Sequence, residues 1–275
     1  MEEFIEIIGE EAGPTSVILA GVHGDERGGI EALQKLLPTL KIEKGRVFLG
    51  YGNPRAIKAN KRFTDANLNR MFKPDSLLSE EEKNSYEYSR AQFIKKYLDQ
   101  SDALLDLHAS YLPDGKPFII CEPIARDIVD FLPVQTVVFG FDQIQPGGTD
   151  YYMNKRGGVG ICVECGYLDD ASSIQVASES ILSFLGAIGH SKSANRPLTR
   201  SYFSIYEMYM TKTDSFTLAK PFVDFERILA GQLIGVDGDK EVRAQKESIV
   251  LFARDCKKVG EEAFLLGEQK NSLAC

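Results

Sequence analysis

Long hydrophobic runs are missing from the sequence, and no segment approaches the roughly 18 apolar residues that a membrane-spanning helix requires. The opening MEEFIEIIGE is acidic and lacks the basic start and apolar centre of a secretory signal. Clusters of Lys and Arg interleaved with aromatic residues are also missing, and the formal net charge at pH 7 is −8. We therefore expect no membrane or nucleic-acid partner and a cytoplasmic location.

Cysteines are few and odd in number. Five in a chain of 275 residues do not make a disulfide framework, and free thiols fit a reducing compartment. Cys162 and Cys165 form a C-x-x-C pair, but no second pair completes a zinc ribbon. Because both flank Glu164 in an apolar run, we interpret them as small core residues rather than a redox pair or metal ligands.

The remaining composition is that of an ordinary globular chain, with 43% hydrophobic and 26% charged residues. Apolar runs rich in β-forming residues alternate with helical stretches, which is typical of an α/β fold with a mostly parallel or mixed sheet flanked by helices. The expected strands cover residues 16–21, 46–52, 103–108, 117–121, 136–140 and 159–163. The expected helices cover residues 28–37, 80–98 and 171–188, the second starting at a capping box of Ser79 and Glu82.

A change of composition follows the last of these helices. Residues 191–200 are rich in Ser, Asn, Pro and Lys, as a linker often is. Beyond it, residues 202–210, 248–252 and 263–266 have the pattern of strands. We therefore predict a large domain over residues 1–195 and a small β-rich C-terminal domain over residues 196–275.

Histidine occurs only three times, so its positions are informative. His23 follows the apolar run SVILAGV, and Glu26 comes three residues later, where a helix is expected to begin. An imidazole and a carboxylate at that spacing can face one point, and both are good zinc ligands. An isolated His-x-x-Glu pair is usually a pair of solvated or capping residues, so it does not establish a metal site.

Two more polar residues end apolar runs in the same way. His108 ends DALLDLH, and Glu164 ends VGICVE. The carboxyl ends of strands in an open α/β sheet form the crevice where ligands bind, so we expect these side chains to converge with His23 and Glu26. Two histidines and one carboxylate, with a fourth position free, are the ligand set of catalytic zinc. Glu164 is then predicted to carry protons, because a carboxylate in an apolar run is costly to bury without a task or a partner.

Residues 52–72, GNPRAIKANKRFTDANLNRMF, provide Arg55, Arg62, Asn69 and Arg70 as substrate-binding candidates. Guanidinium groups bind carboxylates bidentately and stabilise a developing oxyanion. Lys and Arg in loops are mostly solvated, but next to the histidines they indicate an anionic substrate.

Four motifs together resemble those of the succinylglutamate desuccinylase and aspartoacylase family, which is itself similar to the zinc carboxypeptidases. GVHGDERGG resembles its first metal motif, and NPRA followed by DANLNRMF resembles its substrate-binding loop. DLHAS resembles its second metal motif, and VECG resembles its catalytic glutamate motif. The motifs cover residues 17–110 and 159–166.

The resemblance implies that His23, Glu26 and His108 bind one Zn²⁺ per chain, and that Glu164 activates the attacking water. Residues 1–195 would then be a zinc-hydrolase catalytic domain.

For the substrate loop, the resemblance implies that Arg62 polarises the carbonyl and holds the oxyanion, while Asn69 and Arg70 bind the substrate's free carboxylate. The implied activity is that of a metal-dependent amidohydrolase, a deacylase that cleaves the amide bond of a small N-acyl amino acid or a related carboxylate-bearing amide. Two alternatives stay open: a metallocarboxypeptidase acting on short peptides, and a metal-dependent binding module without turnover. A homo-oligomer is compatible with each.

The sequence departs from aspartoacylases at the rim of the pocket. Those enzymes close it with an arginine ahead of the catalytic glutamate and a tyrosine from the C-terminal domain. Here Arg156 lies at a different spacing from Glu164, and residues 249–252 hold no tyrosine. Acetylaspartate specificity is therefore not carried over.

Overall fold

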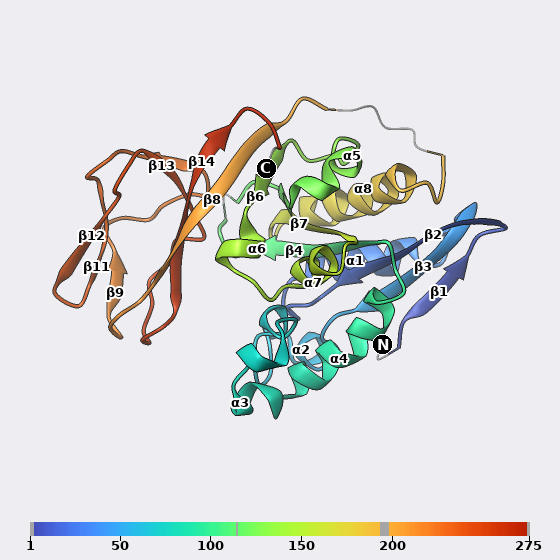
Figure 1. The fold of residues 1–275 in the computed structure, drawn as a ribbon, viewed down its shortest axis with the longest axis horizontal. Helices are drawn as coiled ribbons and strands as arrows, with labels where there is room; N and C mark the ends of the chain where they lie inside the picture. Colours follow the sequence, from blue (N-terminus) through green and yellow to red (C-terminus); the bar gives the residue numbers. More distant parts are fainter. Residues whose placement is uncertain (1–2, 114, 193–197, 274–275) are drawn as a thin grey trace.

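The computed structural model describes residues 3–113, 115–192 and 198–273 (Figure 1). The strands are β1 (Ile5–Ile8), β2 (Glu11–Ala20), β3 (Lys44–Tyr51), β4 (Ala103–Ser110), β5 (Phe118–Cys121), β6 (Thr136–Phe139), β7 (Val159–Tyr167), β8 (Ser201–Met210), β9 (Phe216–Leu218), β10 (Glu226–Ile228), β11 (Leu233–Asp237), β12 (Lys240–Arg243), β13 (Ser248–Leu251) and β14 (Glu262–Lys270). The α-helices are α1 (Arg27–Leu36), α2 (Pro54–Ala59), α3 (Glu80–Lys83), α4 (Tyr86–Leu98), α5 (Arg126–Val129), α6 (Phe141–Ile144), α7 (Thr149–Lys155) and α8 (Ser172–Ala187), with 3-10 turns at Leu68–Arg70, Asp75–Leu77 and Pro123–Ala125.

One mixed sheet of 11 strands runs through the molecule in the order β1-β3-β2-β4-β7-β5-β6-β8-β14-β13-β10. Its pairs β2-β3, β2-β4, β4-β7, β5-β6 and β6-β8 are parallel, whereas β5 runs antiparallel to β7. A separate antiparallel sheet has the order β12-β11-β9. The predicted fold class, a mixed sheet flanked by helices with a β-rich C-terminal part, is confirmed.

Helices cover both faces of the central strands, which explains why these strands are apolar along their whole length. Residues of α1, α5 and α8 pack on one face with Ile18 and Leu105, while residues of α4 and α7 pack on the other with Val17 and Leu104. Neighbouring residues of β2 and of β4 therefore enter different cores. Two helical layers enclose the sheet, as Figure 1 shows.

The single helix expected over residues 80–98 is wrong. The chain forms α3 and α4 instead, because Ser85 interrupts it: the Ser85 hydroxyl donates to the Glu82 carbonyl at 2.6 Å and accepts from the Tyr88 amide at 3.1 Å. Ser85 thus ends one helix and caps the next. The capping box of Ser79 and Glu82 is present at the start of α3.

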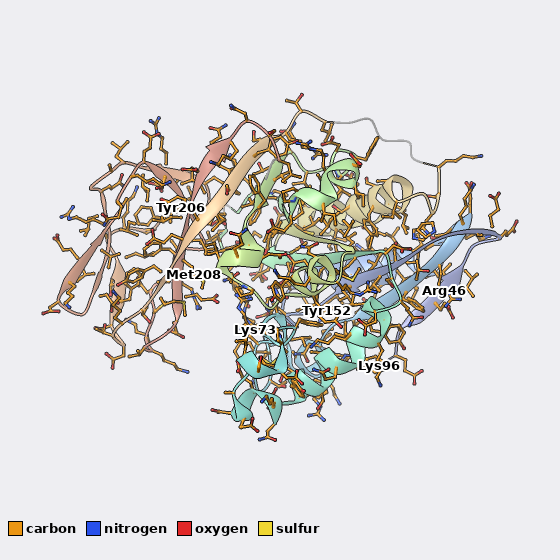
Figure 2. All side chains as sticks on the ribbon, viewed as in Figure 1. Arg46, Lys73, Lys96, Tyr152, Tyr206 and Met208 are labelled. Carbon is orange, nitrogen blue, oxygen red and sulfur yellow. The ribbon has the colours of Figure 1, made fainter. Side chains whose placement is uncertain are left out.

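The C-terminal lobe, defined here as residues 201–270, continues the main sheet. β8 pairs with β6 on one side and with β14 on the other. On β8, Tyr206 packs against the core of the lobe around Phe216 and Phe264, and Met208 packs against a second cluster around Phe118 (Figure 2). The predicted boundary between residues 195 and 196 lies outside the described residues, and the division into two domains stays a prediction.

Within residues 3–113, 115–192 and 198–273, the helices are too short or too polar to cross a lipid bilayer.

Candidate metal centre and active site

Three neighbouring strands, β2, β4 and β7, place the candidate residues at the same edge of the sheet. The chain leaves β2 at Ala20 and reaches His23 in the turn before α1, and Glu26 is the N-cap residue of that helix. His108 lies near the end of β4, directly opposite Glu164 of β7 in the strand register. The convergence expected from the sequence therefore follows from the parallel pairing of these strands.

Two glycines shape the turn that carries His23. Gly21 has a φ of 69°, a left-handed conformation that suits glycine. A Cβ on Gly24 would lie 2.1 Å from the backbone carbon of Ala56 and 2.2 Å from the backbone nitrogen of Ile57. The turn can therefore pack directly against α2 only without a side chain at position 24.

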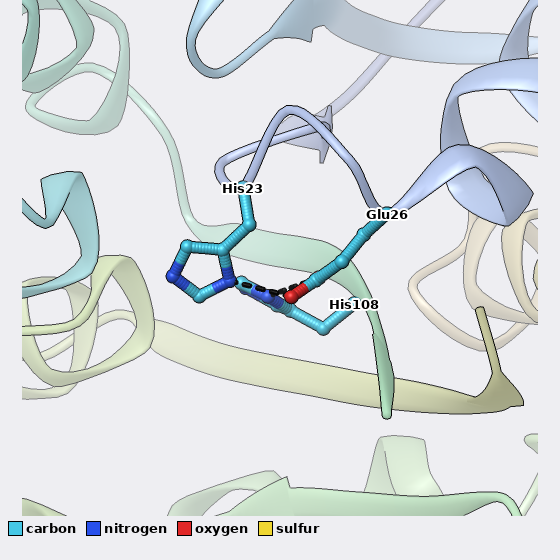
Figure 3. A group of neighbouring side chains, drawn as sticks. All are labelled: His23, Glu26 and His108. Carbon is cyan, nitrogen blue, oxygen red and sulfur yellow. Dashed lines mark hydrogen bonds and ion pairs between the residues drawn. The ribbon is translucent and has the colours of Figure 1, made fainter. Parts of the chain in front are cut away.

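Both histidine rings are directed at one carboxylate (Figure 3). His23 Nδ1 lies 2.7 Å from Glu26 Oε1, and His108 Nδ1 lies 3.0 Å from Glu26 Oε2. One potential ligand atom from each of the three buried residues lies within 4.8 Å of the others. Burial opposes ionisation of Glu26, but the two histidines hold the pKa of that carboxyl well below its usual value. Burial lowers the pKa of His23, which favours the neutral imidazole that a metal ion needs.

Each ring also has a partner on its outer side, which is a hydrogen bond for His23 and an ion-pair contact for His108. Asn67 Oδ1 lies 3.1 Å from His23 Nε2, and Asp106 Oδ2 lies 3.2 Å from His108 Nε2. The Thr149 hydroxyl donates to the same Asp106 oxygen. Contacts of this kind fix the orientation of metal-binding histidines. With two imidazole nitrogens and one carboxylate facing each other, the described residues fit a divalent zinc ion.

Glu164 faces the same space from β7 and is 9% exposed. Burial raises its pKa to about 8, reinforced by the negative charges of Glu26 and Asp224 and opposed by His108 and Arg62. Its Oε2 has no hydrogen-bond partner among the described residues. The carboxyl group can therefore hold a proton near neutral pH and is free to exchange it.

A cavity of about 450 Å³ opens beside His23, Glu26 and His108, which together are called the triad here. It is lined by His23, Glu26, His108, Glu164, Arg62, Asn69 and Arg70 from the sequence-based candidates. Arg55 does not line it, because the Arg55 guanidinium lies on the ring of Tyr86, 4.0 Å from its centroid. The structure thus brings together all the candidate residues except Arg55.

Arg62 connects the substrate loop to the metal centre. Its Nη1 donates to Glu26 Oε1 at 3.1 Å, and its guanidinium lies 5.3 Å from the centroid of the Tyr111 ring. The hydroxyl of Tyr111 in turn donates to Asp25. A positive charge is therefore positioned directly beside the triad and at the cavity surface.

Arg70 is already paired within the protein. Its Nε donates to Glu262 Oε1 at 3.1 Å and its Nη2 to Glu262 Oε2 at 2.9 Å, while Nη1 donates to the Asn69 carbonyl at 2.7 Å. Gln145 Nε2 also donates to Glu262 Oε2, at 2.7 Å. Sequence reasoning missed Glu262 and Gln145, and no local pattern marks either residue.

Glu87 of α4 was also missed, although it holds the substrate loop in place. Its fully buried carboxylate accepts hydrogen bonds from the Asn53 side chain, from the amide and hydroxyl of Thr64, and from the amides of Asp65 and Ala66. Thr64, Asp65 and Ala66 lead directly into the segment that carries Asn67, Asn69 and Arg70. A glutamate that follows Ser85 and Tyr86 gives no signal of this role in the sequence.

Two other sequence features are Arg156, which lies outside the cavity, and the C-x-x-C pair, of which Cys162 forms part of the cavity wall. Arg156 donates to the backbone carbonyls of Asp99 and Ser101 and does not line the cavity. Cys162 packs on the face of β7 that bears Glu164, whereas Cys165 packs in the core on the opposite face. The two thiols are free and buried, as expected for core residues, and they cannot pair across the strand.

Comparisons with known proteins agree with the motifs. Residues 12–185 match the family model of the succinylglutamate desuccinylase/aspartoacylase catalytic domain. The N-alpha-acetyl-L-2,4-diaminobutyric acid deacetylase of Halomonas elongata is 36% identical over 111 residues, which are 38% of this chain and 31% of that protein. The aspartoacylase of Xenopus tropicalis is 33% identical over 118 residues, which are 38% of this chain and 36% of that protein. These matches span about a third of each relative's length.

Similarity of fold extends over nearly the whole chain. The crystal structure of succinylglutamate desuccinylase from Vibrio cholerae superposes with a TM-score of 0.82 at 20% sequence identity, covering 97% of this chain and 85% of that one. Because the family model covers residues 12–185 and the resemblance seen in the motifs is thereby confirmed, the chain belongs to the succinylglutamate desuccinylase/aspartoacylase family.

Proposed function

We propose that this protein is a zinc-dependent deacylase, with one zinc ion per chain, that hydrolyses the amide bond of a small N-acyl amino acid. The observation that carries the proposal is the convergence of His23, Glu26 and His108 beside Glu164 in one cavity. Membership of a family whose members include named deacylases supports it.

A zinc ion held by His23, Glu26 and His108 would polarise the amide carbonyl and lower the pKa of a bound water. Glu164 takes a proton from the attacking water and returns it to the nitrogen of the leaving amine. Burial, which raises the pKa of this group, favours the protonated form that returns the proton, and the positive charge of Arg62 favours the ionised carboxylate that takes it. Arg62, beside Glu26, stabilises the negative charge that develops on the carbonyl oxygen.

The substrate is a small anionic amide. Asn69 and Arg70 line the cavity and provide donors for one carboxylate of the amino acid. Arg55 has no part in this contact, because its guanidinium lies on Tyr86.

Replacing Glu164 with Gln tests the proposal. Glu164→Gln should retain one zinc per chain, measured by metal analysis, and should lose about 10²–10⁴-fold in kcat on N-acyl amino acids, the usual contribution of a proton-transfer group. Glu268→Gln, a change on β14 outside the cavity, is the matched control and should keep wild-type activity. Wild-type activity in Glu164→Gln would show that the proton carrier is another group.

A panel of N-acyl amino acids and dipeptides separates the deacylase from a carboxypeptidase and from a binding module. Hydrolysis of N-acyl amino acids but not of dipeptides supports the deacylase, and the reverse result would show a carboxypeptidase. Zinc binding without hydrolysis of either class would leave a binding module. His23→Ala should lose the metal, which metal analysis measures independently of activity.

A further inference from the structure

Tyr111 lies in the cavity wall but has no role in the proton transfer proposed above. It follows β4 directly, lines the cavity beside the triad and is 49% exposed. The Arg62 guanidinium lies over its ring, with 5.3 Å between the guanidinium carbon and the ring centroid. The Tyr111 hydroxyl donates to Asp25 Oδ2 at 2.5 Å. This half-exposed tyrosine is therefore held at its ring and at its hydroxyl.

Arg62 needs a second contact to be held in one orientation. Its Nη1 donates to Glu26 Oε1 at 3.1 Å, but the Arg62 side chain is 38% exposed, so this bond fixes only one end of the guanidinium. A long side chain anchored at one end keeps much of its rotamer freedom. The ring of Tyr111 supplies the second contact, because a guanidinium within about 6 Å of an aromatic ring is attracted to the face of that ring.

The hydroxyl of Tyr111 ties this contact to the turn that carries two of the candidate metal ligands. Asp25 stands between His23 and Glu26 in the chain, and its carboxylate accepts the hydrogen bond from Tyr111. The ring is therefore fixed relative to the triad. Because Arg62 contacts Glu26 at one end and the ring of Tyr111 on its face, its positive charge has a defined position beside the triad.

We propose that Tyr111 is a positioning residue that holds the Arg62 guanidinium in the orientation needed to stabilise the oxyanion. A charge that is already oriented stabilises the transition state without a cost of reorganisation, so the effect should fall on kcat rather than on KM. The ring acts through Arg62 and does not itself contact the reacting atoms. This inference rests on the proposed deacylase function and on the role of Arg62 in it.

Removal of the ring tests the inference in the zinc-loaded protein, with the N-acyl amino acid that wild type hydrolyses fastest. Tyr111→Leu should lower kcat roughly 3–30-fold, the range expected for a lost cation–π contact, and should change KM less than about twofold. Tyr111→Phe keeps the ring and loses only the bond to Asp25, so its kcat should fall less than that of Tyr111→Leu. A larger loss in Tyr111→Phe would show that the hydroxyl acts directly and would overturn the inference.

Tyr152 of α7 provides the matched control. Its hydroxyl donates to Asp99 and the Lys95 ammonium lies 5.1 Å from the centroid of its ring, so it makes the same two kinds of contact as Tyr111. Tyr152 is not among the residues that line the cavity. Tyr152→Leu should therefore keep the wild-type kcat, and a loss equal to that of Tyr111→Leu would mark the effect as a general one on packing and overturn the inference.

A double-mutant cycle shows whether Tyr111 acts through Arg62. Arg62→Gln should lower kcat about 10²–10³-fold, as the loss of an oxyanion contact does. In that background Tyr111→Leu should cost no further activity, because the side chain that it positions is already gone. An equal loss in both backgrounds would show that Tyr111 acts independently of Arg62 and would overturn the inference.

The contact itself can be measured in the metal-free protein, without any assay of activity. The Arg62 Nε–H signal in a ¹⁵N NMR spectrum, identified by its absence in Arg62→Gln, should shift when the neighbouring ring is removed in Tyr111→Leu. The same signal should stay in place in Tyr152→Leu. A signal that does not move in Tyr111→Leu would overturn the inference, because the ring would then not lie against Arg62 in solution.

Failure of the inference and failure of the proposed function give different results. If wild type hydrolyses no N-acyl amino acid, the deacylase function fails and the inference fails with it. If Arg62→Gln or Tyr111→Leu keeps the wild-type kcat, the inference fails while the deacylase function stands. Circular dichroism and metal analysis check that each variant folds and binds zinc. Should Tyr111→Leu not fold, Tyr111→Gln, which also lacks the ring, decides by the same criteria.

Discussion

Glu87 offers the sharpest test of how the substrate loop is held. Its two carboxylate oxygens divide five hydrogen bonds: Oε1 accepts from Asn53 and twice from Thr64, and Oε2 accepts from the amides of Asp65 and Ala66. Burial alone would raise the pKa of Glu87, but hydrogen bonds from Asn53, Thr64 and Ala66 hold it below its usual value. The group is therefore a charged acceptor inside the protein.

Glu87→Gln keeps the shape of the side chain but replaces one oxygen with an NH₂ group. In the better orientation the amide oxygen takes the three bonds of Oε1, and the amides of Asp65 and Ala66 lose their acceptor. Hydrogen bonds to a charged group contribute roughly 1.5–3 kcal/mol each, so two losses should lower the free energy of unfolding by about 3–6 kcal/mol. Because the loop also carries Asn69 and Arg70, KM should rise together with the loss of stability.

Urea unfolding followed by far-UV circular dichroism measures the effect by linear extrapolation. The exposed Glu81 in α3 provides the matched control, and Glu81→Gln should change the free energy of unfolding by less than about 0.5 kcal/mol. A loss below about 1 kcal/mol in Glu87→Gln would refute the reasoning, since the amides would then have found other acceptors.

Three further predictions concern titration, thiols and the metal. Burial raises the pKa of Glu122 to about 7, so wild type should lose stability as pH rises from the unfolded-state pKa towards 7. Glu122→Gln does not titrate at this position, so its melting temperature relative to that of wild type should increase between pH 5 and pH 8. A difference in melting temperature that stays constant with pH would contradict the prediction. Burial raises the pKa of Cys162 and Cys165 well above the usual value of a thiol. In a Cys275→Ser variant, the four buried thiols should therefore react with a thiol reagent only after denaturation. A fast reaction of the native protein would contradict this prediction. Removing zinc with a chelator should lower the free energy of unfolding by about 3–4 kcal/mol, as expected for a ligand whose free concentration is about 100–1,000 times its Kd. Adding zinc back should restore the free energy of unfolding. An unchanged melting curve would argue against a bound metal.

The sequence predicts the core of the site because its signal is local. His23, His108 and Glu164 each follow an apolar run, and parallel pairing of β2, β4 and β7 is sufficient to bring such positions together. The same reasoning could not find Glu262, which contacts Arg70 across 192 positions and depends on the register of β14 against β8. Nor could it show that Arg55 turns to Tyr86, because that contact depends on how α2 packs against α4.

The direction of β5 relative to β7 could not be predicted from the sequence, for a different reason. A buried strand is apolar along its length whether its neighbour is parallel or antiparallel, so the antiparallel step between β5 and β7 has no local signature. The break between α3 and α4 did have a local signature in the sequence, because Ser85 is a good N-cap residue. The break was missed because the helical pattern continues across Ser85.

The pairing of β6 with β8 has a practical consequence for any shortened version of the chain. β6 has a hydrogen-bonded neighbour on each side, and the ring of Phe118 in β5 lies 5.2 Å from the ring of Phe225 in the C-terminal lobe. Cutting the chain before β8 would remove the hydrogen-bonded neighbour of β6 on one side and expose aromatic side chains. The exposed edge strand would then be prone to aggregate with other copies of the chain. The cut would also remove Glu262 and Phe252 from the cavity wall. A catalytic fragment made in this way would therefore be prone to aggregation and would have an incomplete active-site cavity.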